Sequence, residues 1–243
     1  MATTLIDHDP IEKPIRQRPM LVIELVGPAC AGKTTLTRAL TQGTTKIRVA
    51  PDIFVRRPEH LAVFLRNAPR LLPVLLWGDR KSRSFTWEEV KSMVYLKAWT
   101  HVLTHSGADN NALLLLDQGP VFRLATLHAF GPDSVRKPAA ARWWTARFQQ
   151  WAPFLDLVVW LDAPDAILVK RINARARWHL VKGKSEQEAS QFLDRYRASY
   201  RRVLTQLSVN GGPKIISFDT SLVSIDQVVK AILTVCNGVP DGG

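Results

Sequence analysis

Long apolar runs are missing from this sequence of 243 residues, and no stretch approaches the length needed to span a bilayer. Residues 1–19 are polar and lack the apolar core of a signal peptide, so we expect a flexible lead-in there. These absences argue against membrane-embedded and secreted proteins, and we expect no membrane partner.

Cysteine is also scarce, since the chain holds only Cys30 and Cys236. Cys30 lies in a short glycine-containing loop, where a disulfide would distort the backbone. Two cysteines with no pairing pattern are typical of a reducing compartment, and we expect a cytoplasmic protein.

Acidic residues are few relative to basic ones, 21 against 33, which leaves a formal net charge of +12. Such a charge is compatible with nucleic-acid binding, but no recognisable nucleic-acid-binding module is present. We therefore favour a site that handles several phosphates together with a solvated basic surface, and keep nucleic acid as the alternative. The basic residues concentrate in residues 170–184.

The most informative stretch that is present runs from Gly27 to Thr34 and fits the pattern G-x-x-x-x-G-K-[ST]. It follows an apolar strand-like segment, residues 20–26, and precedes a helix-like one, residues 35–40. Main-chain N–H groups of such a loop and the following helix N-terminus bind phosphate, while the lysine reaches the β- and γ-phosphates and the threonine hydroxyl binds Mg²⁺. The expected nucleotide-binding residues are Gly27, Pro28, Ala29, Cys30, Ala31, Gly32, Lys33, Thr34 and Thr35.

Apolar strand-like segments alternate with helical patterns along the rest of the chain. Strands are expected over residues 20–26, 46–50, 113–116, 157–161 and 214–218. Capping-box patterns at Thr86–Glu89 and Ser185–Glu188 predict the starts of long helices that reach about residues 105 and 207. This alternation predicts an α/β domain with a parallel sheet and right-handed crossovers.

Two acidic residues follow predicted strands, where ligands bind in open α/β sheets. Asp117 ends the apolar strand 113–116 and is the expected Mg²⁺ partner, with a helix N-cap as the alternative role. Asp52 follows the second strand and would face the γ-phosphate, with a plain turn residue as the alternative. Either carboxylate could accept a proton from the phosphate acceptor.

We expect a basic segment outside the phosphate loop to neutralise the negative charge of the phosphate that is transferred. The phosphate loop contains no arginine, so another element has to neutralise these oxygens. Arg171 and Arg175 are four residues apart in a helix predicted over residues 165–177, and so share a face. We expect them to form a lid, the alternative being a solvated basic face.

At this point the sequence resembles the P-loop nucleoside and nucleotide kinases, in particular the thymidylate-kinase-like group, over residues 20–233. The likeness rests on the phosphate loop, on Leu-Leu-Asp117-Gln-Gly, and on Leu161-Asp-Ala-Pro with the basic helix that follows. It implies a three-layer fold whose five-stranded parallel sheet has the order 2-3-1-4-5, with helices on both faces and a basic lid. It also implies ATP-dependent phosphotransfer with Mg²⁺, with Arg171, Arg175 and Arg177 as lid arginines and residues 219–221 near the adenine.

The acceptor side departs from this family. Gln118 stands where relatives carry arginine after the strand-end acid, and Pro51-Asp52 replaces the usual Glu-Pro signature of the second strand. A cation in the first turn of the predicted helix 121–130, Arg123, opposes the helix dipole unless it serves another purpose. The candidate acceptor-binding residues are Asp52, Arg56, Gln118 and Arg123.

The sequence thus predicts one kinase domain over residues 20–237, with the lid at about 171–186 and a loose tail at 238–243. The expected function is transfer of the γ-phosphate of ATP to a small acceptor, most simply a nucleoside or nucleoside monophosphate. The alternatives are a nucleic-acid-end kinase and a nucleotide-gated regulator without acceptor chemistry. A homodimer is among the assemblies that the sequence allows.

Overall fold

The computed structural model describes residues 20–43, 47–50, 58–71, 83–105, 112–176 and 178–237. Within these ranges five strands form one parallel sheet in the order β2-β3-β1-β4-β5, which confirms the predicted fold class. The strands are β1 (Met20–Val26), β2 (Ile47–Val49), β3 (Ala112–Asp117), β4 (Leu157–Asp162) and β5 (Lys214–Asp219). The predicted lead-in and tail lie outside the described residues.

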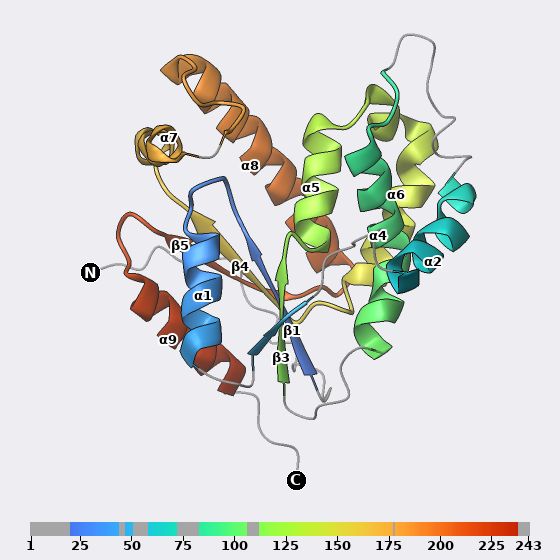
Figure 1. Ribbon diagram of the computed structural model, residues 1–243, viewed down its shortest axis with the longest axis horizontal. Helices are drawn as coiled ribbons and strands as arrows, with labels where there is room; N and C mark the ends of the chain where they lie inside the picture. The colour runs from blue at the N-terminus through green and yellow to red at the C-terminus, as the bar shows by residue number, and fades with distance from the viewer. Residues whose placement is uncertain are drawn as a thin grey trace.

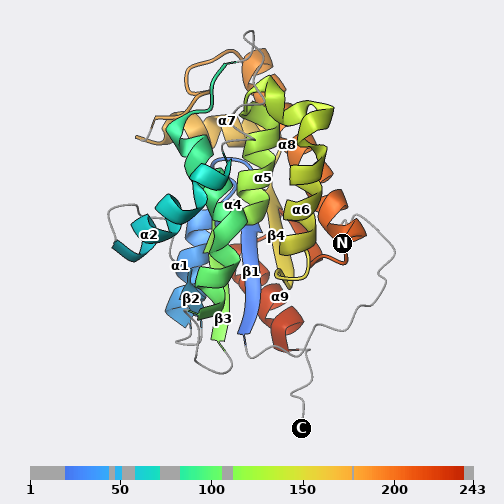
Figure 2. The same ribbon diagram turned by 90° about the vertical axis from the view of Figure 1, so that its right-hand side faces the viewer.

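Helices cover both faces of the sheet, with α1 and α9 on one side and α4, α5 and α6 on the other (Figure 1; Figure 2). They are α1 (Lys33–Gly43), α2 (Pro58–Asn67), α4 (Trp87–His105), α5 (Pro120–Phe130), α6 (Ala141–Trp151), α7 (Asp165–Ala174), α8 (Glu186–Val209) and α9 (Ile225–Asn237). Short 3₁₀ turns are η1 (Pro69–Leu71), η2 (Asp133–Arg136) and η3 (Pro138–Ala140). No helix in these ranges combines the length and the apolar character that a membrane crossing requires.

Alternate residues of each strand enter two separate cores, as expected for a sheet that is buried on both faces. Ile23 and Leu25 pack with α1 and α9. Val22 and Val26 pack instead with α4, α5, α6 and α8, in a core that contains Trp99. Tyr95 and Trp99 of α4 belong to this core and are 3% and 0% exposed.

Strand register brings the functional segments to one edge of the sheet. Leu25 near the end of β1 lies beside Asp117 at the end of β3, and Val26 lies beside Trp160 of β4. The phosphate loop after β1, the turn after β3 and the turn after β4 therefore start from neighbouring positions.

Capping boxes start three of the helices. Glu89 accepts a hydrogen bond from the Thr86 main-chain N–H at 2.7 Å, and Glu188 accepts one from Ser185 at 3.1 Å, so both predicted helix starts are confirmed. A third box starts α9, where the Ser224 main-chain N–H donates to Gln227 Oε1 at 2.8 Å.

The predicted helix 165–177 was too long, because α7 ends at Ala174 and Arg175 has extended backbone angles. Residues 178–184 fold back against this end of the helix. The Gly183 main-chain N–H donates to Asn173 Oδ1 at 3.1 Å, and the Lys182 ammonium bonds to the Arg175 carbonyl. These contacts replace the next helical turn, so Arg171 and Arg175 do not share a helix face.

Replacing Ser185 by alanine should lower the free energy of unfolding by about 1 kcal/mol, because an N-cap oxygen is lost. Ser208→Ala, at an exposed position in the last turn of the same helix, should change it by less than about 0.5 kcal/mol. Urea unfolding followed by circular dichroism measures both, and equal effects would contradict a role for the capping box.

Candidate active site

The phosphate loop turns sharply between β1 and α1. Gly27 and Gly32 have φ angles of 135° and 100°, which glycine adopts without strain. A Cβ at Gly27 would lie 1.9 Å from the carbonyl oxygen of Leu161 in β4, so glycine is required there by space as well as conformation. Cys30 also has a left-handed backbone conformation, with a φ of 63°, although it is not a glycine.

Lys33 begins α1 and crosses back over this loop. Its ammonium donates to the carbonyl oxygens of Gly27 and Pro28, both at 2.7 Å. Burial lowers the pKa of Lys33 to about 8, and the carboxylate of Asp117 acts in the opposite direction. Since the first turn of α1 contains no acidic residue, its positive dipole end also faces this loop without internal neutralisation.

Thr34 and Asp117 are the expected magnesium ligands, and both are exposed at this edge of the sheet. Hydroxyl and carboxylate oxygens suit Mg²⁺, which keeps several waters and uses few protein ligands. Within the described ranges no cluster of three or more His, Cys, Asp or Glu side chains could hold a metal. The Thr34 hydroxyl and the Asp117 carboxylate are the kinds of donor that suit a magnesium ion shared with phosphates. The N-cap of α5 is Gly119, so the alternative role of Asp117 as the N-cap is wrong.

Two predicted lid arginines approach the phosphate loop from α7. Arg171 donates to the hydroxyl and carbonyl of Thr220 at 2.9 and 3.0 Å, and to the Cys30 carbonyl at 3.4 Å. Arg175 lies with Nη1 at 3.5 Å from Cys30 Sγ. Both therefore lie beside the loop although they do not share a helix face. Arg177 lies outside the described residues.

Arg197, which the sequence analysis missed, fixes the turn that leads into α7. It donates to Asp162 Oδ2 at 2.8 Å, to Asp165 Oδ1 at 2.5 Å and to the Ala163 carbonyl at 3.0 Å. Its guanidinium comes from α8, and the sequence signal was the pair of aspartates around Pro164. This contact holds the start of the helix that carries Arg171.

A pocket of about 240 Å³ lies next to the turn after β3. Its lining combines polar and apolar side chains: Glu88, Glu89, Ser92, Gln118, Phe122, Arg123, Thr126 and Leu127. Gln118 and Arg123 were predicted acceptor residues and do meet here. Asp52 and Arg56 lie outside the described residues.

Arg123 is buried in this wall, which accounts for a cation in the first turn of α5. Its Nη1 donates to Ser92 Oγ at 3.2 Å, and its guanidinium lies 4.3 Å from the centre of the Tyr95 ring. The acidic group that faces it is Glu24, a fully buried residue of β1 that the sequence analysis also missed. The signal was one charged residue within an apolar strand.

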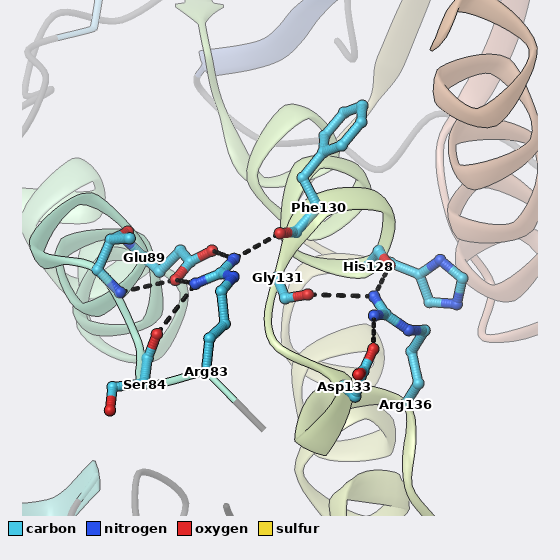
Figure 3. Close-up of polar contacts among 9 residues, drawn as sticks. Arg83, Ser84, Glu89, His128, Phe130, Gly131, Asp133 and Arg136 are labelled. Carbon is cyan, nitrogen blue, oxygen red and sulfur yellow. Dashed lines mark hydrogen bonds and ion pairs between the residues drawn. The ribbon is translucent and has the colours of Figure 1, made fainter. Parts of the chain in front are cut away.

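Glu89 at the edge of the pocket is held by Arg83 (Figure 3). The guanidinium donates to both Glu89 oxygens, at 2.9 and 2.5 Å, and to the Phe130 carbonyl at the end of α5. Partial burial raises the pKa of Glu89, but the hydrogen bonds from Arg83 and Thr86 outweigh it and leave the pKa below its ordinary value. Arg136 caps the same end of α5 through the His128 and Gly131 carbonyls.

Gly27→Ala should lower the free energy of unfolding by at least about 3 kcal/mol, because its Cβ meets a strand carbonyl. Gly183→Ala is a matched control, since Gly183 also has positive φ but no atom lies within 4 Å of its Cβ position. That variant should cost only about 1 to 2 kcal/mol. Equal losses in chemical denaturation would show that the contact with Leu161 is unimportant.

Comparison with known proteins agrees with this geometry. A family model described as AAA domain matches residues 22–203, most of the chain. No curated protein shows a significant sequence match to the chain.

Solved structures with a similar fold include deoxyadenosine kinase from M. mycoides with dCMP and a flexible dCDP bound. It is 12% identical, the alignment covers 90% of this chain and 100% of that chain, and the TM-score is 0.50. Thymidylate kinase from Candida albicans is 16% identical over 90% of this chain and 91% of that chain, with a TM-score of 0.51. At these identities the likeness is one of fold. The chain belongs to the AAA domain family, and its fold is that of the P-loop nucleoside and nucleotide kinases.

Proposed function

We propose that the chain is an ATP-dependent phosphotransferase that moves the γ-phosphate of ATP to a small acceptor, a nucleoside or a nucleoside monophosphate. The observation that carries this proposal is the placement of two binding elements at one edge of the sheet. The phosphate loop follows β1, the pocket borders the turn after β3, and these strands are neighbours in register.

The chain's own residues supply charge and position rather than covalent chemistry. Main-chain donors of residues 27–34 and the Lys33 ammonium would bind the β- and γ-phosphates. Arg171 and Arg175, which lie beside Cys30, would neutralise the transferring oxygens. Arg177 would join them.

Thr34 and Asp117 are the residues that would hold Mg²⁺, which neutralises phosphate charge when bound. The acceptor would lie in the pocket beside Gln118 and Arg123. Its proton has two candidate acceptors, Asp117 and Asp52, and Arg56 would complete this side of the site.

A screen with labelled ATP against nucleosides, nucleoside monophosphates and sugars tests the proposal. The expected result is phosphate transfer to one acceptor class, abolished by Lys33→Ala. ATP binding without transfer to any acceptor would favour a nucleotide-gated regulator. Transfer to oligonucleotide ends, with binding that weakens steeply with salt, would favour the nucleic-acid alternative suggested by the +12 charge.

Arg175→Ala should lower kcat roughly 100- to 1,000-fold while changing the ATP Kd by less than about threefold, because this cation acts on developing charge. Lys170→Ala, which removes an exposed cation from α7, is the control and should keep kcat within about twofold. Steady-state kinetics and calorimetry measure the two quantities. A weaker ATP affinity at normal kcat would contradict the lid role.

A further inference from the structure

Glu24 occupies an unusual position for an acidic residue. It lies in the middle of β1, in register with Leu116 of β3 and Val158 of β4, and its exposed fraction is 0%. Burying a carboxyl group is costly unless hydrogen-bond donors surround it. Its surroundings therefore indicate what the residue does.

The carboxylate oxygens accept hydrogen bonds from the first turn of α5. The main-chain N–H groups of Val121 and Phe122 each donate to a Glu24 oxygen at 2.9 Å. Donors in a first helical turn have no partner within the helix, and the N-cap residue Gly119 has no side chain to supply one. Glu24 thus caps α5 from a distant strand, with both of its oxygens accepting N–H groups of the first helical turn.

The turn before α5 is shaped around this carboxylate. A Cβ at Gly119 would lie 2.7 Å from Glu24 Cδ and 2.9 Å from Oε2, although the φ of Gly119, −72°, is open to any residue. Gln118, the preceding residue, has a φ of 58°, which residues other than glycine rarely adopt. Glycine at 119 is therefore required by the Glu24 side chain together with Leu116 Cβ, which lies 2.9 Å from the same position. Gln118 carries the strained backbone conformation of the turn.

This turn and the first turn of α5 carry the residues that face the proposed acceptor. Gln118, Phe122 and Arg123 line the pocket, and Asp117 precedes them at the strand end. The Arg123 guanidinium also lowers the pKa of Glu24, although burial outweighs it and raises that pKa to about 8. The buried Glu24 carboxyl group therefore binds the backbone of the first turn of α5 and interacts with Arg123, which lines the pocket.

The same carboxyl group lies near the phosphate loop. The Tyr196 and Tyr200 hydroxyls lie 3.0 Å apart. Burial raises the pKa of both tyrosines, and the nearby Glu24 contributes to the same shift. Tyr200 also lies close to Gly27 at the start of the phosphate loop. The start of α5 and the first glycine of the loop therefore both lie close to this group of buried polar side chains.

We propose that Glu24 is a positioning residue for phosphotransfer: it holds the start of α5 so that Asp117, Gln118 and Arg123 face the phosphate loop. The inference rests on the proposed function. Because its side chain is fully buried, Glu24 acts through α5 and the preceding turn and does not touch the substrates.

Glu24→Gln tests this role, since it keeps the shape but turns one acceptor oxygen into an N–H donor that faces a main-chain donor. Ser199→Ala is the matched control. The Ser199 hydroxyl of α8 donates to the Ala125 carbonyl of α5 at 2.7 Å, so this variant also loses a buried hydrogen bond to α5 but leaves its start intact. The measurements are kcat and KM with labelled ATP and with deoxyadenosine or dTMP as acceptor, the ATP Kd, and the Tm.

The expected result for Glu24→Gln is an acceptor kcat/KM at least about tenfold lower, with the ATP Kd within about twofold of the unmodified chain. Ser199→Ala should keep kcat/KM within about twofold of the unmodified chain, even if its Tm falls as far as that of Glu24→Gln. An active unmodified chain whose Glu24→Gln variant keeps normal kcat/KM, or loses no more than Ser199→Ala, would overturn the inference alone. An unmodified chain that phosphorylates neither acceptor would count against the proposed function instead.

If Glu24→Gln does not fold, Gly119→Ala disturbs the same turn from its other side and should give the same kinetic pattern. Hydrogen exchange on the unmodified chain adds a test without any substitution. The Val121 and Phe122 amide protons should exchange at least about 100-fold more slowly than in an unfolded peptide, because Glu24 accepts both. Unprotected amides at these two positions would contradict the anchoring on which the inference depends.

Discussion

The close approach of Gly27 to the Leu161 carbonyl is the constraint on which the site depends. Because β1 and β4 are neighbours, the chain can turn into the phosphate loop only where no side chain projects toward β4. The turn brings Lys33 back across the Gly27 and Pro28 carbonyls and aims the start of α1 at the same space. Everything proposed for this site uses that geometry.

Two contacts then set the walls beside the loop: a partly buried ion pair and a buried carboxyl group that accepts main-chain hydrogen bonds. Arg197 joins Asp162 to Asp165 and so places α7 with Arg171. Glu24 binds the start of α5 and so places the turn after β3. Glu24 is fully buried and Arg197 is mostly buried, and each fixes an element that borders the site. Removing the Glu24 carboxyl group would leave the Val121 and Phe122 N–H groups without an acceptor, which costs more than the net stabilisation of these hydrogen bonds.

Local patterns predicted most of the fold. Five strand segments and two capping boxes each depend on residues within a few positions of one another, and these elements were confirmed. The predicted end of α7 was wrong because Asn173 and Arg175 form hydrogen bonds with Gly183 and Lys182, which lie later in the chain.

The buried contacts were missed for a related reason. Glu24 and Val121 are 97 positions apart, and Arg197 and Asp162 are 35 apart, so no local pattern links them. An acidic residue within an apolar strand marks such a contact but does not name its partner. Of the four predicted acceptor residues, Gln118 and Arg123 line the pocket, while Asp52 and Arg56 lie outside the described residues. The other lining residues come from α4 and α5 and were not predicted.

Calorimetry of MgATP binding to the unmodified chain at pH 8, in two buffers of different ionisation enthalpy, tests the central claim most directly. Burial holds the pKa of Lys33 at about 8, and bound phosphates should raise it. The account predicts saturable binding with uptake of about half a proton, lost in Lys33→Ala. No saturable binding, or the same proton uptake in Lys33→Ala, would contradict it.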